Sequence, residues 1–139
     1  MIVIYHSFSG NTKDLAELIS TQLGSIPLYR INKYTDEVLP DLNQFDKIIL
    51  GTFTWGQGEI PSEVRKFIKE QQQYFQQKEV YLFGTGDTQF GGDELFCSAV
   101  DVLNRIIKSP IEPLKIEQHY QGSQEQMVID WCNRIKERG

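Results

Sequence analysis

The sequence predicts an α/β fold in which a doubly wound, mostly parallel sheet is covered by helices on both faces. Short apolar runs typical of buried strands alternate, along the whole chain, with segments whose apolar residues recur at helical spacing. This alternation favours a parallel sheet, because each helix returns the chain to the start of the next strand. In such sheets ligands bind beyond the carboxyl ends of the strands, so a functional site is expected there.

Five strands are expected. The first opens the chain on a continuous apolar run, which indicates burial on both faces. The third and fourth strands are expected to end at Gly51 and Gly84, and the fifth alternates apolar and polar residues as an edge strand does. The expected strands are residues 2–5, 26–31, 48–50, 80–83 and 114–119.

Four amphipathic helices are expected between and after these strands. The first ends at Gly24, the second opens at Pro61-Ser62, and two prolines after Ile107 end the third. A short helix is also expected within residues 33–45, which are long for a connection without structure. The apolar faces comprise Leu15, Leu18, Ile19 and Leu23; Val64, Phe67, Ile68, Tyr74 and Phe75; Leu95, Phe96, Ala99, Val100, Leu103, Ile106 and Ile107; and Met127, Val128, Trp131 and Ile135.

Length and composition fit one domain spanning residues 1–139, of which 40% are hydrophobic and 24% charged. The net charge of −5 disfavours nucleic acids and anionic membranes, and favours either a basic protein partner or simple solubility. Cys97 and Cys132 lack metal-binding spacing, and His6 and His119 are interpreted as strand residues rather than metal ligands. Without a recognisable signal peptide or membrane span, a cytoplasmic protein is expected.

A loop of small, mostly polar residues joins the first strand to the first helix: Ser7, Phe8, Ser9, Gly10, Asn11 and Thr12. The first N–H groups of a helix lack intrahelical partners and the helix dipole is positive there, so this position suits an anion. The loop's hydroxyls and amide supply neutral donors, and Gly10 lets the backbone approach closely. Because lysine, arginine and a Walker pattern are absent from the loop, it favours a terminal monophosphate. The alternative is an ordinary helix cap without a ligand.

Two further loops follow the third and fourth strands and emerge at the same edge. The first, residues 51–61, contains Trp55, which is expected either to pack on the sheet edge or to cover a flat ligand. The second, residues 85–94, contains Asp87 and the aromatic Phe90. Two aromatic rings at one edge could enclose a flat ring system between them. Alternatively, the glycines and Asp87 only form turns.

Four motifs in this order resemble those of the flavodoxin family, in its short-chain form, over nearly the whole chain. They are the phosphate loop [ST]-x-[ST]-G-N-T at Ser7–Thr12, a Trp-Gly pair at Trp55-Gly56, a Gly-Asp pair at Gly86-Asp87, and a Phe-Cys-x-Ala-Val-Asp stretch at Phe96–Asp101. The resemblance implies a three-layer, flavodoxin-like sandwich with strand order 2-1-3-4-5, and flavin mononucleotide (FMN) as a non-covalently bound cofactor.

The resemblance also implies roles for individual residues. Ser7 to Thr12 would hold the FMN phosphate, and Trp55 would cover one face of the isoalloxazine ring. The Gly56 carbonyl would accept a hydrogen bond from flavin N5 after one-electron reduction, which stabilises the neutral semiquinone. Thr85, Gly86 and Asp87 would bind the polar edge of the ring through backbone groups.

Phe90 stands where the family usually has a stacking tyrosine, and Gly91 to Leu95 form an insertion behind it. Stacking on the outer face of the ring is therefore expected to survive without the phenol. The full set of expected cofactor-binding residues is Ser7, Phe8, Ser9, Gly10, Asn11, Thr12, Thr52, Phe53, Thr54, Trp55, Gly56, Thr85, Gly86, Asp87, Phe90, Phe96 and Cys97.

The function implied by the resemblance is that of a low-potential, one-electron carrier that cycles between flavin semiquinone and hydroquinone. It would move electrons from a flavin-dependent NAD(P)H reductase to acceptor enzymes. Such a carrier needs no catalytic acid, base, nucleophile or metal, and none is arranged at the ligand edge of the predicted sheet. A monomer is expected, because the edge of the flavin must stay accessible to partners.

Three alternatives compete with this function. The Gln89-Phe90-Gly91 run is similar to small flavoproteins that activate manganese-dependent class Ib ribonucleotide reductases, although those usually lack the Trp-Gly pair. An NAD(P)H-dependent flavin enzyme would need a second nucleotide site, which the sequence does not show. A phosphoacceptor receiver domain needs acidic residues where His6-Ser7 and Gly51-Thr52 stand, so it is excluded.

Overall fold

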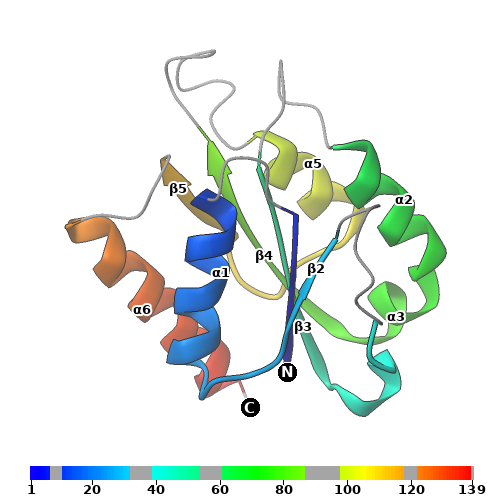
Figure 1. Ribbon diagram of the computed structural model, residues 1–139, viewed down its shortest axis with the longest axis horizontal. Coiled ribbons are helices and arrows are strands. Elements are labelled where there is room, and N and C mark those ends of the chain that lie inside the picture. Colours follow the sequence, from blue (N-terminus) through cyan, green and yellow to red (C-terminus); the bar gives the residue numbers. More distant parts are fainter. Residues whose placement is uncertain (7–10, 32–38, 54–60, 87–97, 118–121, 139) are drawn as a thin grey trace.

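The computed structural model describes residues 1–6, 11–31, 39–53, 61–86, 98–117 and 122–138. Its five parallel strands pair in the order β2-β1-β3-β4-β5, which confirms the predicted fold (Figure 1). The strands are β1 (Ile2–Tyr5), β2 (Leu28–Arg30), β3 (Lys47–Phe53), β4 (Glu79–Gly86) and β5 (Leu114–Glu117). The helices are α1 (Asn11–Gln22), α2 (Ser62–Glu70), α3 (Gln72–Gln77), α5 (Ser98–Ile106), α6 (Ser123–Glu137) and the short 3₁₀ helix η1 (Leu42–Gln44).

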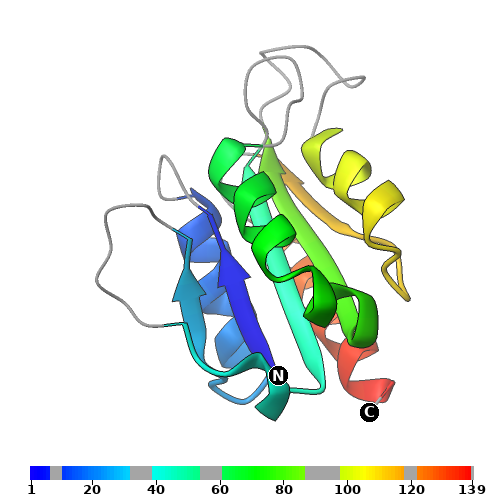
Figure 2. The same cartoon turned by 90° about the vertical axis from the view of Figure 1, so that its right-hand side faces the viewer.

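Helices cover both faces of the sheet. α1 and α6 lie on one face, and α2, α3 and α5 lie on the other (Figure 2). Successive strand residues point to opposite faces, so Ile2 and Ile4 of β1 pack with α2, α3 and α5, whereas Val3 and Tyr5 pack with α1 and α6. Burial on both faces explains why β1 is apolar without a break.

β3 and β4 extend through Gly51 and Gly84, the two glycines at which the sequence predicts their ends. Residues 51–53 of the expected loop therefore belong to β3, and β4 takes in the first two residues of the next expected loop. A Cβ on Gly51 would stand 2.0 Å from Cζ of Phe83, and one on Gly84 would stand 2.1 Å from Cγ2 of Val100. The predicted ends were wrong because these glycines permit close packing rather than turns.

Other element bounds also differ from the expectation. β2 covers only three residues of the expected strand 26–31. The second helix is two helices, because Gln71 leaves the helical conformation between α2 and α3, and Phe67 and Phe75 then pack edge to face across the break. The short helix expected within residues 33–45 is confirmed by η1. Met127, expected on the apolar face of α6, is 48% exposed, because it lies beside β5 at the end of the sheet.

In the described part of the chain, no helix is long and apolar enough to cross a membrane. The same residues include no group of three His, Cys, Asp or Glu side chains that could hold a metal ion. Cys132 is buried in α6, and burial raises the pKa of its thiol to about 12. This thiol is therefore a packing group rather than a reactive one. Cys97 lies outside the described residues.

Candidate functional site

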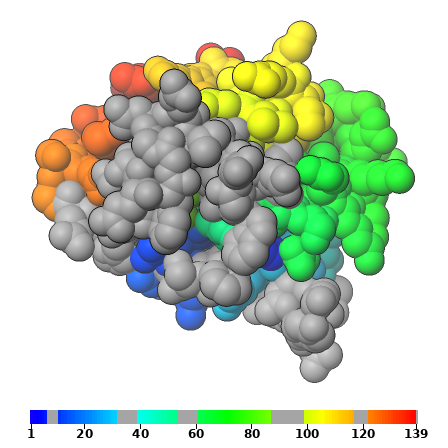
Figure 3. All heavy atoms as spheres, turned by 90° about the horizontal axis from the view of Figure 1, so that it is seen from above, coloured from blue at the N-terminus to red at the C-terminus, as the bar shows by residue number. Residues whose placement is uncertain are grey.

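The carboxyl ends of β1, β3 and β4 meet at one edge of the sheet, which we call the carboxyl edge. Phe53, the last residue of β3, lies beside Thr85 of β4 in the pairing register. α1 begins at this edge, and Figure 3 looks onto it, with α1 (blue) and α5 (yellow) on opposite sides of the sheet. The carboxyl edge therefore gathers the described residues of the predicted cofactor site: Asn11, Thr12, Thr52, Phe53, Thr85 and Gly86.

A hydrogen bond between two buried hydroxyl groups connects two of the predicted loops. Thr12 Oγ1 and Thr85 Oγ1 lie 2.8 Å apart, and these residues are only 1% and 3% exposed. Thr12 lies in the first turn of α1 and Thr85 near the end of β4, so the bond holds the start of the helix to the strand. Whichever hydroxyl accepts this bond keeps its own proton, which it can donate to a ligand.

The start of α1 supplies further donors at the same edge. α1 is a 12-residue helix whose first residues are Asn11 and Thr12. The N–H groups of its first turn have no partner within the helix, and the positive end of the helix dipole lies beside them. Neutral N–H, hydroxyl and amide donors at a helix N-terminus suit a phosphate.

The end of β3 brings an aromatic ring to the carboxyl edge. Thr52 is fully buried, and its hydroxyl donates to the carbonyl oxygen of Phe53 at 3.1 Å. Gly84 on the neighbouring strand leaves room for this backbone, since a Cβ there would lie 3.1 Å from the Thr52 carbonyl oxygen. The half-buried Phe53 ring stacks on the His6 ring, with centroids 5.2 Å apart and planes at 27°. β3 thus delivers Phe53 to the position immediately before the segment that contains Trp55.

His6 lies at the carboxyl edge, although sequence reasoning did not include it among the expected site residues. Its backbone N–H donates to the Gly51 carbonyl at 3.0 Å, so it continues the strand pairing. Its ring, however, also lies close to a carboxylate, with Nε2 3.6 Å from Oε2 of Glu63. Burial lowers the pKa of His6 below its ordinary value, while the Glu63 charge raises it and the Arg30 charge lowers it. The only signal in the sequence was a histidine directly before the predicted anion loop.

The other predicted site residues lie outside the described part of the chain. Their proposed contacts with a cofactor stay predictions. They are Ser7, Phe8, Ser9, Gly10, Thr54, Trp55, Gly56, Asp87, Phe90, Phe96 and Cys97.

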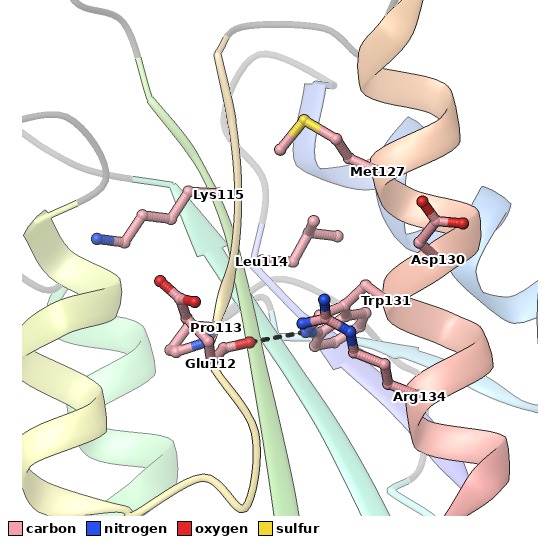
Figure 4. A pocket seen from close by; sticks show the side chains of 8 residues that line it. All are labelled: Glu112, Pro113, Leu114, Lys115, Met127, Asp130, Trp131 and Arg134. Atoms are coloured by element: carbon pink, nitrogen blue, oxygen red, sulfur yellow. Dashed lines mark hydrogen bonds between the residues drawn. The ribbon is translucent and has the colours of Figure 1, made fainter.

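A separate groove of about 310 Å³ lies between β5 and α6 (Figure 4). Trp131 of α6 lines it, donates from Nε1 to the Glu112 carbonyl at 3.0 Å, and packs edge to face with Phe83. These contacts hold α6 to the segment that enters β5. The groove contains none of the predicted site residues; it is lined by Glu112, Pro113, Leu114, Lys115, Met127, Asp130, Trp131 and Arg134.

Comparisons with known proteins agree on one family. The family model described as Flavodoxin matches residues 3–110. Probable flavodoxin 2 of Bacillus subtilis (strain 168) is 31% identical over 147 residues, which cover 99% of this chain and 95% of that protein. Flavodoxin 1 of Escherichia coli (strain K12) is 34% identical over 109 residues, which cover 76% of this chain and 60% of that protein.

Solved structures agree with this result. Oxidised Flavodoxin 2 from Bacillus cereus is 29% identical and matches with a TM-score of 0.76 over 99% of both chains. Flavodoxin 1 from the same organism, at 23% identity and a TM-score of 0.76, shares the fold. The family model covers most of the chain, and the B. subtilis relative covers nearly all of it. The chain therefore belongs to the flavodoxin family, whose members bind FMN and carry electrons.

Proposed function

We propose that this flavodoxin works as one FMN-binding domain that carries single electrons at low potential. It takes them from a flavin-dependent NAD(P)H reductase and delivers them to acceptor enzymes. Family membership supports FMN binding and electron transfer in general. The observation that best supports a cofactor site at the carboxyl edge is the buried hydrogen bond between Thr12 and Thr85, which joins the start of α1 to the end of β4.

The described residues at the start of α1 fit the phosphate of FMN. The helix offers its first-turn N–H groups, and the Thr12–Thr85 pair retains a hydroxyl proton for donation. These donors are neutral, so they suit a monophosphate held by hydrogen bonds and the helix dipole. Residues 7–10 would complete this binding loop.

The ends of β3 and β4 fit a flat ring. Phe53 places an aromatic side chain at this edge, and Trp55 and Phe90 are proposed to cover the two faces of the ring. The Gly56 carbonyl would accept a hydrogen bond from the ring, and the backbone of residues 85–87 would bind its polar edge. When bound, FMN supplies the one-electron chemistry. The protein's part is to orient the ring, exclude water from its faces and set the charge around it.

The charge of the chain supports both a low potential and a basic partner. At −5, the net charge opposes the addition of negative charge to a bound cofactor. The same charge would steer a partner that has a basic docking surface, through a field that salt screens. Electron transfer from the reductase is therefore expected to slow as the salt concentration rises.

Titration with FMN, followed by reduction of the complex, tests this proposal. We expect tight binding and two separate one-electron potentials; a single two-electron wave would contradict the carrier role. Thr12→Val should weaken FMN binding, whereas Thr21→Val is the matched control. Thr21 lies on the same helix, is exposed, and donates only to the Glu17 carbonyl, so its replacement should leave FMN binding unchanged.

The choice of electron partner separates this function from the alternative that the sequence leaves open. A carrier should exchange electrons with a general NAD(P)H-dependent flavin reductase. Rapid reaction with the metal-binding subunit of a class Ib ribonucleotide reductase, together with none from general donors, would favour the activator function instead. Stopped-flow absorbance of the bound flavin reports both reactions.

A further inference from the structure

The His6 ring contacts both sides of the segment proposed to carry Trp55. On one side it stacks on Phe53, which directly precedes residues 54–60, with centroids 5.2 Å apart. On the other side, its Nε2 lies 3.6 Å from Oε2 of Glu63, shortly after that segment. We propose that His6 is a positioning residue of the FMN site, which fastens both ends of residues 54–60 and does so more strongly when a phosphate occupies the neighbouring loop. The identity of the phosphate ligand rests on the proposed function.

The backbones of His6, Phe53 and Glu63 are held by the sheet or by α2. The backbone N–H of His6 donates to the Gly51 carbonyl, which fixes the histidine against β3. Phe53 is the last residue of β3, and Glu63 lies in the first turn of α2, where the Ser62 hydroxyl donates to its Oε2 at 3.3 Å. A contact from one ring to these two elements therefore limits how far the ends of residues 54–60 can separate.

The strength of this fastening depends on the charge of the ring. Glu63 on α2 raises the pKa of His6 and Arg30 on β2 lowers it, whereas β3 contributes the uncharged Phe53. Burial is the largest effect and lowers the pKa, because the side chain is only 13% exposed. Burial therefore favours the neutral ring, and an approaching anion favours the charged ring. Its Nδ1 is buried and has no hydrogen-bond partner among the described residues.

A phosphate next to His6 changes this balance. Ser7, the first residue of the proposed phosphate loop, directly follows His6. A dianion at this distance favours the cationic ring, which then gains a charge-assisted contact with Glu63. Because linkage is reciprocal, protonation of His6 must also favour phosphate binding. FMN affinity should therefore rise as the pH falls from about 8 to about 5, the range in which a histidine gains its proton.

A pH titration of the His6 ring, monitored by NMR, tests whether a bound phosphate favours the charged ring. The chain has two histidines, so His119→Gln leaves His6 as the single ring to observe. We expect FMN to raise the midpoint of the His6 titration, and riboflavin, which lacks the phosphate, to leave it in place. Equal midpoints with FMN and riboflavin would overturn the inference.

Hydrogen exchange tests the fastening step. In the FMN-loaded protein, His6→Gln should increase amide exchange in residues 54–60 and leave residues 122–138 unchanged. The same variant should lose the pH dependence of FMN affinity, so that at the lower pH it binds FMN up to about tenfold more weakly than the wild type. Glu63→Gln should also increase amide exchange in residues 54–60 and weaken FMN binding at the lower pH, but both effects should be smaller than in His6→Gln. Wild-type exchange and a wild-type pH profile in His6→Gln would show that the histidine fastens nothing.

The two proposals fail in different ways. Absence of FMN binding at any pH would overturn the proposed function and this inference with it. FMN binding that leaves both the His6 midpoint and the exchange of residues 54–60 unchanged would overturn the His6 inference alone. If His6→Gln does not fold, the titration in His119→Gln still decides the question.

Discussion

The two edges of the sheet use polar side chains in opposite ways. At the amino edge, where β3 and β4 begin, the Tyr81 hydroxyl donates to Glu79 Oε2 at 2.9 Å, and Arg138 donates to the Tyr81 hydroxyl at 3.2 Å. At the carboxyl edge, the bonded hydroxyls of Thr12 and Thr85 are buried, and Nδ1 of the partly buried His6 ring lacks a partner among the described residues.

This difference suggests different roles for the two sets of residues: the amino-edge set stabilises the fold, and the carboxyl-edge set is available to bind a ligand. Glu79, Tyr81 and Arg138 satisfy one another and fix the end of α6 to the sheet, since Arg138 directly follows that helix. At the carboxyl edge, the buried Thr12–Thr85 pair and Nδ1 of His6 retain hydrogen-bonding capacity that protein atoms in the described part of the chain do not use. Buried polar groups with unused capacity are expensive in folded proteins and are concentrated where ligands bind.

The largest expected effect comes from Gly84→Ala, which disturbs the carboxyl edge through its packing. The new Cβ would stand 2.1 Å from Val100 Cγ2 and 3.1 Å from the Thr52 carbonyl oxygen, so the strand end must shift. Urea denaturation of the apoprotein should show a loss of about 1–3 kcal/mol, as is typical of overpacking. Adding Val100→Ala should recover part of this loss, and wild-type stability of Gly84→Ala would refute the packing explanation.

The next largest effect is expected from Thr85→Val, which removes one hydroxyl of the buried pair without changing its shape. The Thr12 hydroxyl then lacks its partner, which costs about 1–3 kcal/mol for a buried group. We also expect calorimetry to show FMN affinity lowered by about tenfold, which corresponds to about 1.4 kcal/mol, because the start of α1 is no longer held to β4 in the geometry that binds the phosphate.

Two further variants test whether the loss of FMN affinity in Thr85→Val comes from the broken hydrogen bond. Thr85→Ser keeps the hydroxyl and should restore most of the affinity. The double variant Thr12→Val/Thr85→Val should lose less than the sum of the two single losses, because each single variant already breaks the same bond. Additive losses would mean that the two hydroxyls act independently.

The smallest effect is expected at the amino edge. The Tyr81 hydrogen bond, followed by the Arg138 contacts, lowers the pKa of Glu79, so the cluster stabilises the ionised carboxylate. This contribution is present above the unfolded-state pKa and disappears as the pH falls through the lowered folded-state pKa. Because the Glu79 and Arg138 side chains are 39% and 42% exposed, solvent screens their charges, and Glu79→Gln should lower the urea midpoint only slightly at pH 7 and not at all in acid. A changed FMN affinity in Glu79→Gln would contradict the claim that the amino-edge cluster is structural and only the carboxyl edge binds FMN.

The fold followed from the sequence because its determinants are local and periodic. Apolar runs at 2–5 and 48–50 indicated strands buried on both faces, and the alternation with helices implied a parallel sheet. Parallel strands end at one edge, so the location of Thr12 and Thr85 at a common edge could also be expected. Their mutual hydrogen bond could not, because it joins residues 73 positions apart through tertiary packing alone.

The errors arise where one residue type has two physical uses. The pattern predicts strand ends at Gly51 and Gly84, but both glycines permit close contact with side chains from distant segments, Phe83 and Val100. The interpretation of His6 as a strand residue is not contradicted, but the pattern could not reveal the contacts of its ring with Phe53 and Glu63, which are remote in the sequence. These contacts depend on tertiary packing, which the local sequence pattern does not show.

An amide chemical-shift map of the apoprotein titrated with FMN tests the central claim most directly. We predict large shifts for Asn11, Thr12, Thr85 and Gly86 at the carboxyl edge. Glu79 at the amino edge, and Met127 and Trp131 in the groove between β5 and α6, should not shift. Shifts confined to the amino edge or to that groove, with the carboxyl edge unchanged, would contradict the assignment of this edge as the FMN site.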